Sequence, residues 1–219
     1  MNKIIVEVSI GELLDKISIL EIKQEKIKDP EKLRFISNEH SILKKQLDDN
    51  VKSDDKIKDL FQSLKDINAK LWVIEDDKRQ CEKDKDFGEK FIKLSRDVHF
   101  LNDDRAKIKL EIKQTKIKDP EKLKFINNEH SILKDQLEKN VKSEDKLNNL
   151  YQSLKEINRK LWVIEDDKRQ CEKDKDFGEK FIKLSRDVHF LNDDRAKIKL
   201  EINNHTGSVI KEIKEYTSY

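Results

Sequence analysis

The stretch LWVIEDDKRQCEKDKDFG occupies residues 71–88, and the same letters return unchanged at residues 161–178. Its apolar residues are separated by short charged runs, a pattern typical of one face of a helix. Near its end, Asp86 followed three positions later by Glu89 matches the capping box that begins a new helix. The stretch therefore predicts the end of one helix, a turn and the start of a second helix.

The repeated stretch belongs to a longer unit of 90 residues. Residues 21–110 align without a gap with residues 111–200, and 77 of the 90 positions are identical. No difference falls after residue 69 of the first copy, and most of the differences exchange one polar residue for another, as Lys45 and Asp135 do. Self-similarity of this length indicates the duplication of a whole structural unit.

The composition favours long helices. Charged residues make up 43% of the chain and hydrophobic residues 35%, and only 4 glycines and 2 prolines are available for turns. Such a chain can build a core only along narrow apolar seams, which suits an all-α fold. The 2 cysteines are the same position of the two repeats, so the sequence carries no disulfide framework.

Charge and hydropathy argue against two classes of partner. The 48 Lys and Arg residues nearly balance the 46 Asp and Glu residues and alternate with them, whereas nucleic-acid-binding proteins usually cluster one sign of charge. No apolar run approaches the roughly 20 residues of a membrane span, and the N-terminal segment makes a poor signal peptide. We therefore expect a cytoplasmic protein that binds neither nucleic acid nor a membrane.

Capping signals and apolar spacing divide the first repeat into helices. Ser9 with Glu12 forms a capping box. Asp29 before Pro30 supplies an N-cap and a proline at the first helical position. The predicted helices span about residues 10–27, 30–49, 54–83 and 87–117. No helix breaker interrupts the last of them, so it continues into the second repeat as that repeat's first helix.

These elements predict two antiparallel four-helix-type bundles in tandem, residues 1–104 and 105–219, which share the continuous helix at 87–117. That helix would be about 46 Å long, and bundles placed end to end would make the molecule elongated. Cys81 and Cys171 would then lie at opposite tips, too far apart for a disulfide, and act as buried small hydrophobic residues. The alternating segments at 3–8 and 208–214 could pair as a small β-ribbon.

Counting from the predicted turns places a layer of polar side chains at the middle of each bundle. The first layer comprises Ser18, Glu39, His40, Asn68, Asn102 and Arg105, and the second comprises His130, Asn158, Asn192 and Arg195. Because histidine and arginine suit a phosphate or a carboxylate, the layer predicts a binding pocket for a small anion. The alternative is a hydrogen-bonded network that fixes helix register, which we favour because a thin bundle leaves little room for a ligand.

A second candidate surface surrounds the repeated tryptophan. It consists of Trp72, Glu75 and Arg79 in the first repeat and of Trp162, Glu165 and Arg169 in the second. An aromatic residue beside arginine is a common anchor for a protein partner. The alternative is that the tryptophan packs within the bundle while the glutamate and the arginine four residues later pair along the helix.

Catalytic and metal-binding patterns are weak. Glu12 and Asp15, together with acids near residue 75, imitate the paired carboxylates of all-α magnesium enzymes, but the second repeat has Asn102 and Arg105 at the first two positions. Zinc spacings such as CxxC and HExxH are absent from the sequence. The sequence thus predicts no catalytic residue, no metal and no cofactor.

Three segments resemble a small bacterial and phage family known only as a domain of unknown function. They are VSIGELLDKISILEIK at 8–23, LWVIEDDKR at 71–79 and RDVHFLNDDRAKIKLEIN at 186–203. The resemblance meets the family patterns V-S-x-G-E-L-x-D-K and L-W-x-I-E-D at Glu12, Asp15, Lys16, Trp72, Glu75, Asp76, Asn102 and Arg105. It implies a helical fold and no particular activity, and the tandem arrangement departs from the family's usual single unit.

From these observations we expect a non-enzymatic helical scaffold or protein-interaction module with a protein partner, present as a monomer with an internal pseudo-dimer or as a homodimer. The alternative is a protein or enzyme that binds a small phosphorylated or sugar-nucleotide ligand at the polar layer.

Overall fold

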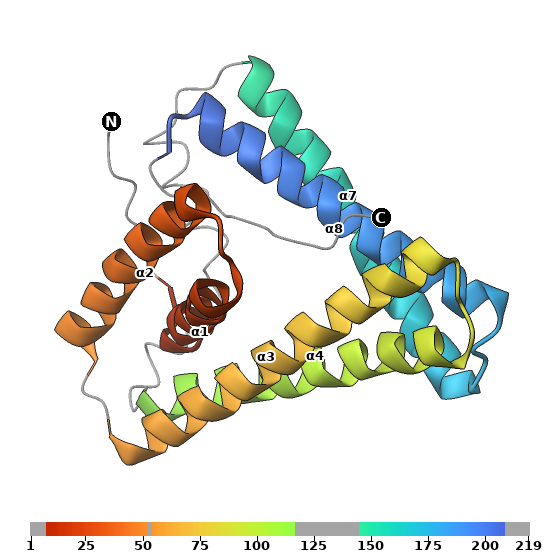
Figure 1. Cartoon of the computed structure of the whole chain (residues 1–219), viewed down its shortest axis with the longest axis horizontal. Helices are drawn as coiled ribbons and strands as arrows, with labels where there is room; N and C mark the ends of the chain where they lie inside the picture. Colours follow the sequence, from red (N-terminus) through yellow and green to blue (C-terminus); the bar gives the residue numbers. More distant parts are fainter. Residues whose placement is uncertain (1–7, 52–53, 117–144, 209–219) are drawn as a thin grey trace. The chain divides into compact units, whose positions relative to one another are not determined.

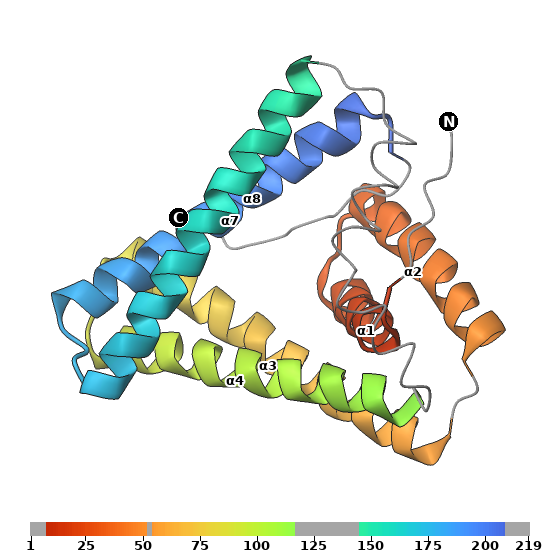
Figure 2. The same cartoon turned by 180° about the vertical axis from the view of Figure 1, so that it is seen from behind.

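The computed structural model describes residues 8–51, 54–116 and 145–208, and all regular secondary structure in these ranges is α-helical (Figures 1 and 2). The all-α prediction is therefore confirmed. The proposed β-ribbon falls on residues 3–8 and 208–214, nearly all of which lie outside the described ranges, and so does His130.

The first two helices begin where the capping signals predicted. Helix α1 spans Ile10–Lys26, and the Ser9 hydroxyl accepts a hydrogen bond from the Glu12 amide at 3.2 Å. Helix α2 spans Pro30–Asn50, and the Asp29 carboxylate accepts hydrogen bonds from two amides of its first turn. Each side chain satisfies N–H groups that have no partner within the helix.

Two longer helices follow and form an antiparallel hairpin. Helix α3 spans Asp55–Asp84 and α4 spans Glu89–Lys116, so the predicted helix across the junction of the repeats is continuous over its described residues. The chain reverses at Lys85, whose φ of 57° is left-handed, and the Gly88 amide donates to the Asp86 carboxylate at 3.0 Å. The opening stretch is therefore a helix end, a turn and a helix start, as predicted.

The second repeat forms the same hairpin. Helix α7 spans Asp145–Asp174 and α8 spans Glu179–His205, and the two lie side by side in both views (Figures 1 and 2). Lys175 takes the place of Lys85 with a φ of 56°, and the Gly178 amide donates to Asp176. The identical sequence thus folds identically at both turns.

The chain divides into two compact units, each built from two segments that are separate in the sequence. The first unit holds α1, α2, the part of α3 up to Leu71 and the part of α4 from Leu101. The second holds the turn end of the α3–α4 hairpin together with α7 and α8. The physical reason is helix length: α3 has 30 residues and α1 only 17, so apolar residues beyond the reach of α1 need another partner.

The first unit has its core where α1 packs on α3 and α4. Leu14, Ile57, Leu64 and Ile112 form a buried cluster. Gly11 lets α1 approach α4 closely, because a Cβ atom built there would lie 2.5 Å from the backbone oxygen of Lys109. A larger residue at position 11 would therefore push α1 away from α4.

The second unit has a core that corrects one prediction. Cys81, Phe91 and Leu94 form a buried cluster against which Ile182 of α8 packs. The turn end of the first hairpin is therefore covered by the second repeat, whereas bundles placed end to end would leave it as a remote tip. Both cysteines are free and buried as predicted, and burial raises the pKa of the Cys81 and Cys171 thiols.

We expect Gly11→Ala to destabilise the first unit even though alanine is the better helix former by about 1 kcal/mol. The added methyl group would meet backbone rather than a flexible side chain, so α1 must shift, with a loss of about 1–3 kcal/mol. Urea unfolding followed by circular dichroism measures the change. Gly88→Ala is the control, because its Cβ would meet only the Asp86 carboxylate at 3.2 Å. Equal losses in both variants would contradict the close-approach argument.

Candidate functional site

The two repeated hairpins meet through paired ionic contacts in the second unit. The Arg186 guanidinium donates two hydrogen bonds of 2.8 Å to the Glu82 carboxylate. The equivalent residues of the other repeat form the same contact: the Arg96 guanidinium donates hydrogen bonds of 2.9 and 2.6 Å to the Glu172 carboxylate. The same contact is thus made twice with the roles of the repeats exchanged, which is the signature of a two-fold related, self-complementary interface.

Each arginine of these pairs also covers an aromatic ring of the other hairpin. The guanidinium carbon of Arg186 lies 4.4 Å from the ring centre of Phe87, and Arg96 lies at the same distance from Phe177. Phe87 and Phe177 are the phenylalanines of the repeated Asp-Phe-Gly. A planar guanidinium can bind a carboxylate in the ring plane and stack its face on an aromatic ring at the same time.

The turn end of α3 and α4 forms a hairpin bundle with α7 and α8, and the interior of this bundle holds further charged groups. Lys78 and Lys168, which are equivalent positions, are 2% and 3% exposed. Lys168 lies 3.3 Å from Glu165, and the Glu75 carboxylate lies 3.8 Å from the imidazole Nδ1 of His189. Arg79, also buried, donates two hydrogen bonds to Asp193. The bundle therefore buries charge in mutually neutralising pairs.

These surroundings shift the pKa values of the groups. Burial raises the pKa of Glu75, but Lys78, His189 and Arg79 outweigh it and hold the pKa at about 2. Burial lowers the pKa of Lys168, with Glu165 opposing and the nearby Lys78 reinforcing the shift. Hydrogen bonds from the paired arginines lower the pKa values of Glu82 and Glu172.

The first unit contains part of the predicted polar layer. Asn68 donates hydrogen bonds to Asp15 at 2.9 Å and to the Ser18 hydroxyl at 2.8 Å, and Arg105 binds Asp15 with two nitrogens. Asp15 is the centre of this network, although the sequence pattern did not place it in the polar layer. Its position three residues before Ser18, on the same face of one helix, was the available signal.

The other members of the predicted layer lie apart from this network. His40 lies 3.8 Å from Glu21 instead, and Asn102 is exposed. In the second repeat Asn158 is exposed, and Asn192 and Arg195 are half-buried. The structure thus brings together Ser18, Asn68 and Arg105 but does not gather the full set.

The predicted tryptophan surface is divided between interior and exterior. Glu75 and Arg79 belong to the charged interior of the hairpin bundle. Trp72 is half-buried, whereas Trp162 is 74% exposed and Arg169 is exposed. The Arg–Glu pairs could not be predicted from the sequence, because a charged residue on a helix face usually points to solvent and its spacing does not identify a partner.

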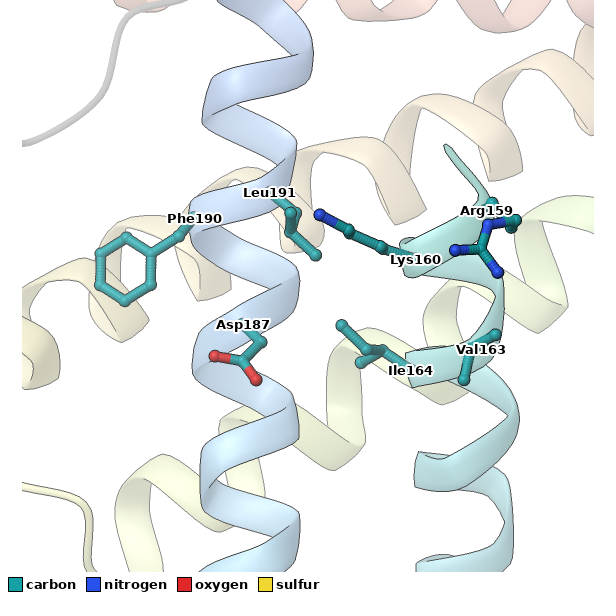
Figure 3. Close-up of a pocket in the computed structure, with 7 residues that line it drawn as sticks. All are labelled: Arg159, Lys160, Val163, Ile164, Asp187, Phe190 and Leu191. Carbon is teal, nitrogen blue, oxygen red and sulfur yellow. The ribbon is translucent and has the colours of Figure 1, made fainter. Parts of the chain in front are cut away.

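A shallow groove of about 500 Å³ runs between α7 and α8 (Figure 3). Ile164 of α7 and Leu191 of α8 point toward one another across it, and polar side chains stand around them. The lining residues are Arg159, Lys160, Val163, Ile164, Asp187, Phe190 and Leu191.

Fold and site together define an all-α protein in which two copies of one helical hairpin pack on each other. Residues 4–119 match a family of unknown function, DUF6165, and because this match covers more than half of the chain, the protein belongs to that family. No curated protein and no solved structure matches the chain. Within the described ranges, no helix is long and apolar enough to cross a membrane, and no group of three or more His, Cys, Asp or Glu side chains could hold a metal ion.

We expect Arg186→Glu to lower the free energy of unfolding by about 2–4 kcal/mol, because it places two partly buried carboxylates face to face. The double variant Arg186→Glu with Glu82→Arg should recover part of this loss. Chemical unfolding of both variants measures the coupling. Lys107→Glu is the control, because the described partner of Lys107 is Asp104 on the exposed face of the same helix, so a change of about 0.5 kcal/mol or less is expected. No recovery in the double variant would contradict the pairing.

We also expect an acid-dependent loss of stability that depends on Glu75. Its folded pKa of about 2 lies below the ordinary value of 4.5, so its contribution is complete above about pH 4.5 and is lost as the pH falls toward 2. About a third of the side chain is exposed, and solvent screening limits this contribution to about 1–2 kcal/mol. Unfolding between pH 2 and 6 should show a shallower pH dependence in Glu75→Gln than in the wild type. An unchanged slope would remove Glu75 from the account.

Proposed function

We propose that this protein is a non-enzymatic helical scaffold or protein-interaction module of the cytoplasm, built by tandem duplication of one 90-residue unit. The observation that carries the proposal is the doubled Arg–Glu contact between the repeats, Arg186 with Glu82 and Arg96 with Glu172. These four charged side chains hold helices of the two repeats together.

A surface that is complementary to an identical surface is the property that makes a homodimer. Here the two surfaces are identical in sequence, because residues 72–100 recur as residues 162–190, and both belong to one chain. The linked repeat is always present at high effective concentration. We infer that the duplication converts a dimer of single units into a monomeric pseudo-dimer, which keeps its shape at any protein concentration.

The arrangement of the polar network favours this function over ligand binding. Both nitrogens of Arg105 that face Asp15 are occupied by its carboxylate, and the Asn68 amide is shared between Asp15 and Ser18. A phosphate would have to displace these short internal contacts, and the network therefore suits a register-fixing role.

The proposal predicts that a fragment of residues 1–119 forms a homodimer while the full-length chain is a monomer. In the fragment, Arg96 of each copy would take the Glu82 carboxylate of the other copy in place of Glu172. Light scattering coupled to size-exclusion chromatography measures both masses. Arg96→Glu should make the fragment monomeric, and Lys93→Glu, a change at an exposed residue of the same helix, should not.

Two outcomes would count against the scaffold. A folded fragment that remains monomeric at high concentration would remove its structural basis. A reproducible rise in Tm of the full-length protein with nucleotides, sugar nucleotides or divalent metals, lost in His40→Ala or Arg105→Ala, would favour the ligand-binding alternative.

A further inference from the structure

The face of α3 and α4 that receives α1 is built from a small set of residues. Leu64 and Ile112 supply the apolar contact to Leu14, and both are 0% exposed. Asn68 and Arg105 supply the polar contact through Asp15 of α1. A seam of this kind recognises a helix by apolar fit and by one buried carboxylate.

The second repeat carries the same receiving face on α7 and α8. The residues 90 positions after Leu64, Asn68, Arg105 and Ile112 are Leu154, Asn158, Arg195 and Ile202, with no change of residue type. The only apolar exchanges on the face, Leu147 for Ile57 and Tyr151 for Phe61, are close in size. The face is thus present twice in one chain.

The second copy of the face is more exposed. Leu154 and Ile202 are half-buried where their equivalents are fully buried, and Asn158 is exposed where Asn68 is 6% exposed. Within the described ranges, the side chains of Asn158 and Arg195 form no hydrogen bond or ion pair, whereas Asn68 and Arg105 both bind Asp15. Among the residues that the structure describes, the contact made by Asp15 in the first repeat therefore has no counterpart here.

The chain does not contain a second copy of the matching helix. The residues 90 positions after Gly11, Asp15 and Ser18 are Leu101, Arg105 and Ile108. A leucine cannot replace the glycine at the close approach to α4, where even a Cβ atom would lie 2.5 Å from a backbone oxygen. An arginine at the place of Asp15 would repel Arg195.

We propose that this face of α7 and α8 is a docking site for an amphipathic helix of a partner protein that carries the α1 pattern G-x-x-L-D-x-x-S. The glycine would permit close approach of the two helices, and the leucine would fill the apolar seam. The aspartate would accept hydrogen bonds from Asn158 and Arg195, and the serine hydroxyl would accept one from Asn158. The inference rests on the proposed interaction function and specifies the partner of that function.

Charge and shape extend the match beyond this pattern. In the first repeat, Lys65 binds Glu21 at 2.9 Å and Glu25 at 3.2 Å on the C-terminal half of α1. Its equivalent is Lys155, and Arg159, one turn further along α7, replaces an alanine. The partner helix should therefore carry acids after its serine. The groove of Figure 3 borders the face, because Leu191 precedes Arg195 by one turn of α8.

The probe for this site is a fluorescently labelled synthetic peptide of residues 8–27 titrated with the full-length protein and followed by fluorescence anisotropy. We expect saturable binding of one peptide per chain. Arg195→Ala should weaken binding at least tenfold, and a peptide with Gly11→Leu should lose binding. Lys197→Ala is the matched control on α8 and should leave the affinity within twofold, because Lys197 is exposed and, among the described residues, pairs with Asp194 of its own helix.

A charge exchange identifies the contact itself. Arg195→Glu should abolish binding of the native peptide and restore binding of a peptide with Asp15→Arg. Circular dichroism melts of each variant establish that the bundle is folded; within the described ranges Arg195 forms no hydrogen bond or ion pair that its replacement would break. A peptide that displaces the chain's own α1 would instead respond to Arg105→Ala and not to Arg195→Ala, and this result would overturn the inference.

Three further results would also overturn it. These are no binding at all, binding that Arg195→Ala leaves unchanged, and a wild-type dimer that Arg195→Ala converts to monomer, which would show that a second copy of the chain covers the face. If the peptide fails while residues 1–119 still form the Arg96-dependent dimer, this inference alone falls. If that dimer fails, the proposed function falls with it.

Discussion

The fold of the second unit depends on one interaction that is made twice. An arginine of each hairpin donates hydrogen bonds from two of its nitrogens to a glutamate of the other hairpin, and its guanidinium stacks on a phenylalanine. A guanidinium needs a planar acceptor at a fixed angle, so these contacts fix how the hairpins cross in a way that apolar seams alone do not. All thirteen differences between the repeats fall outside residues 72–100. The part of the duplicated unit that packs against its own copy is therefore the part that is unchanged.

Burying so much charge is a poor route to stability, because desolvation offsets most of the attraction between opposite charges. Lys78 and Lys168 are both buried, and the pKa of Lys168 is lowered mainly by burial, with repulsion from the nearby Lys78 adding to the shift. What such groups provide is uniqueness, because a hairpin shifted by one helical turn would separate Arg186 from Glu82 and Arg96 from Glu172. In a chain whose apolar seams are narrow and repetitive, this penalty distinguishes one packing from its many near neighbours.

The sequence was sufficient to predict the individual helices. Ser9, Asp29 and the Asp86 turn mark their starts, and periodic apolar residues mark their buried faces. The packing of helices far apart in sequence could not be predicted, because periodicity says which face is buried but not what buries it. In the sequence alone, Arg96 and Glu172 cannot be distinguished from solvated charges, because their contact forms only when the two hairpins pack. Asp15 likewise has its partners, Asn68 and Arg105, on other helices. The site was therefore harder to predict than the fold.

The point at which the duplicated unit begins gives the two halves of this protein different roles. The repeat starts at residue 21, inside α1, so the receiving face formed by α3 and α4 was copied as α7 and α8, whereas residues 10–20 were not copied. At the positions where a second Gly11 and Asp15 would stand, the chain has Leu101 and Arg105. These two residues are part of α4 in the first unit, where Arg105 donates to Asp15. Position 105 cannot be both the arginine that binds Asp15 and the aspartate that a second copy of α1 would need. A duplication with these boundaries therefore leaves one α1 for two matching faces, and the first face is filled by the α1 to which it is linked. The asymmetry is a consequence of where the repeat begins, and it is the basis of the docking site that we propose on α7 and α8.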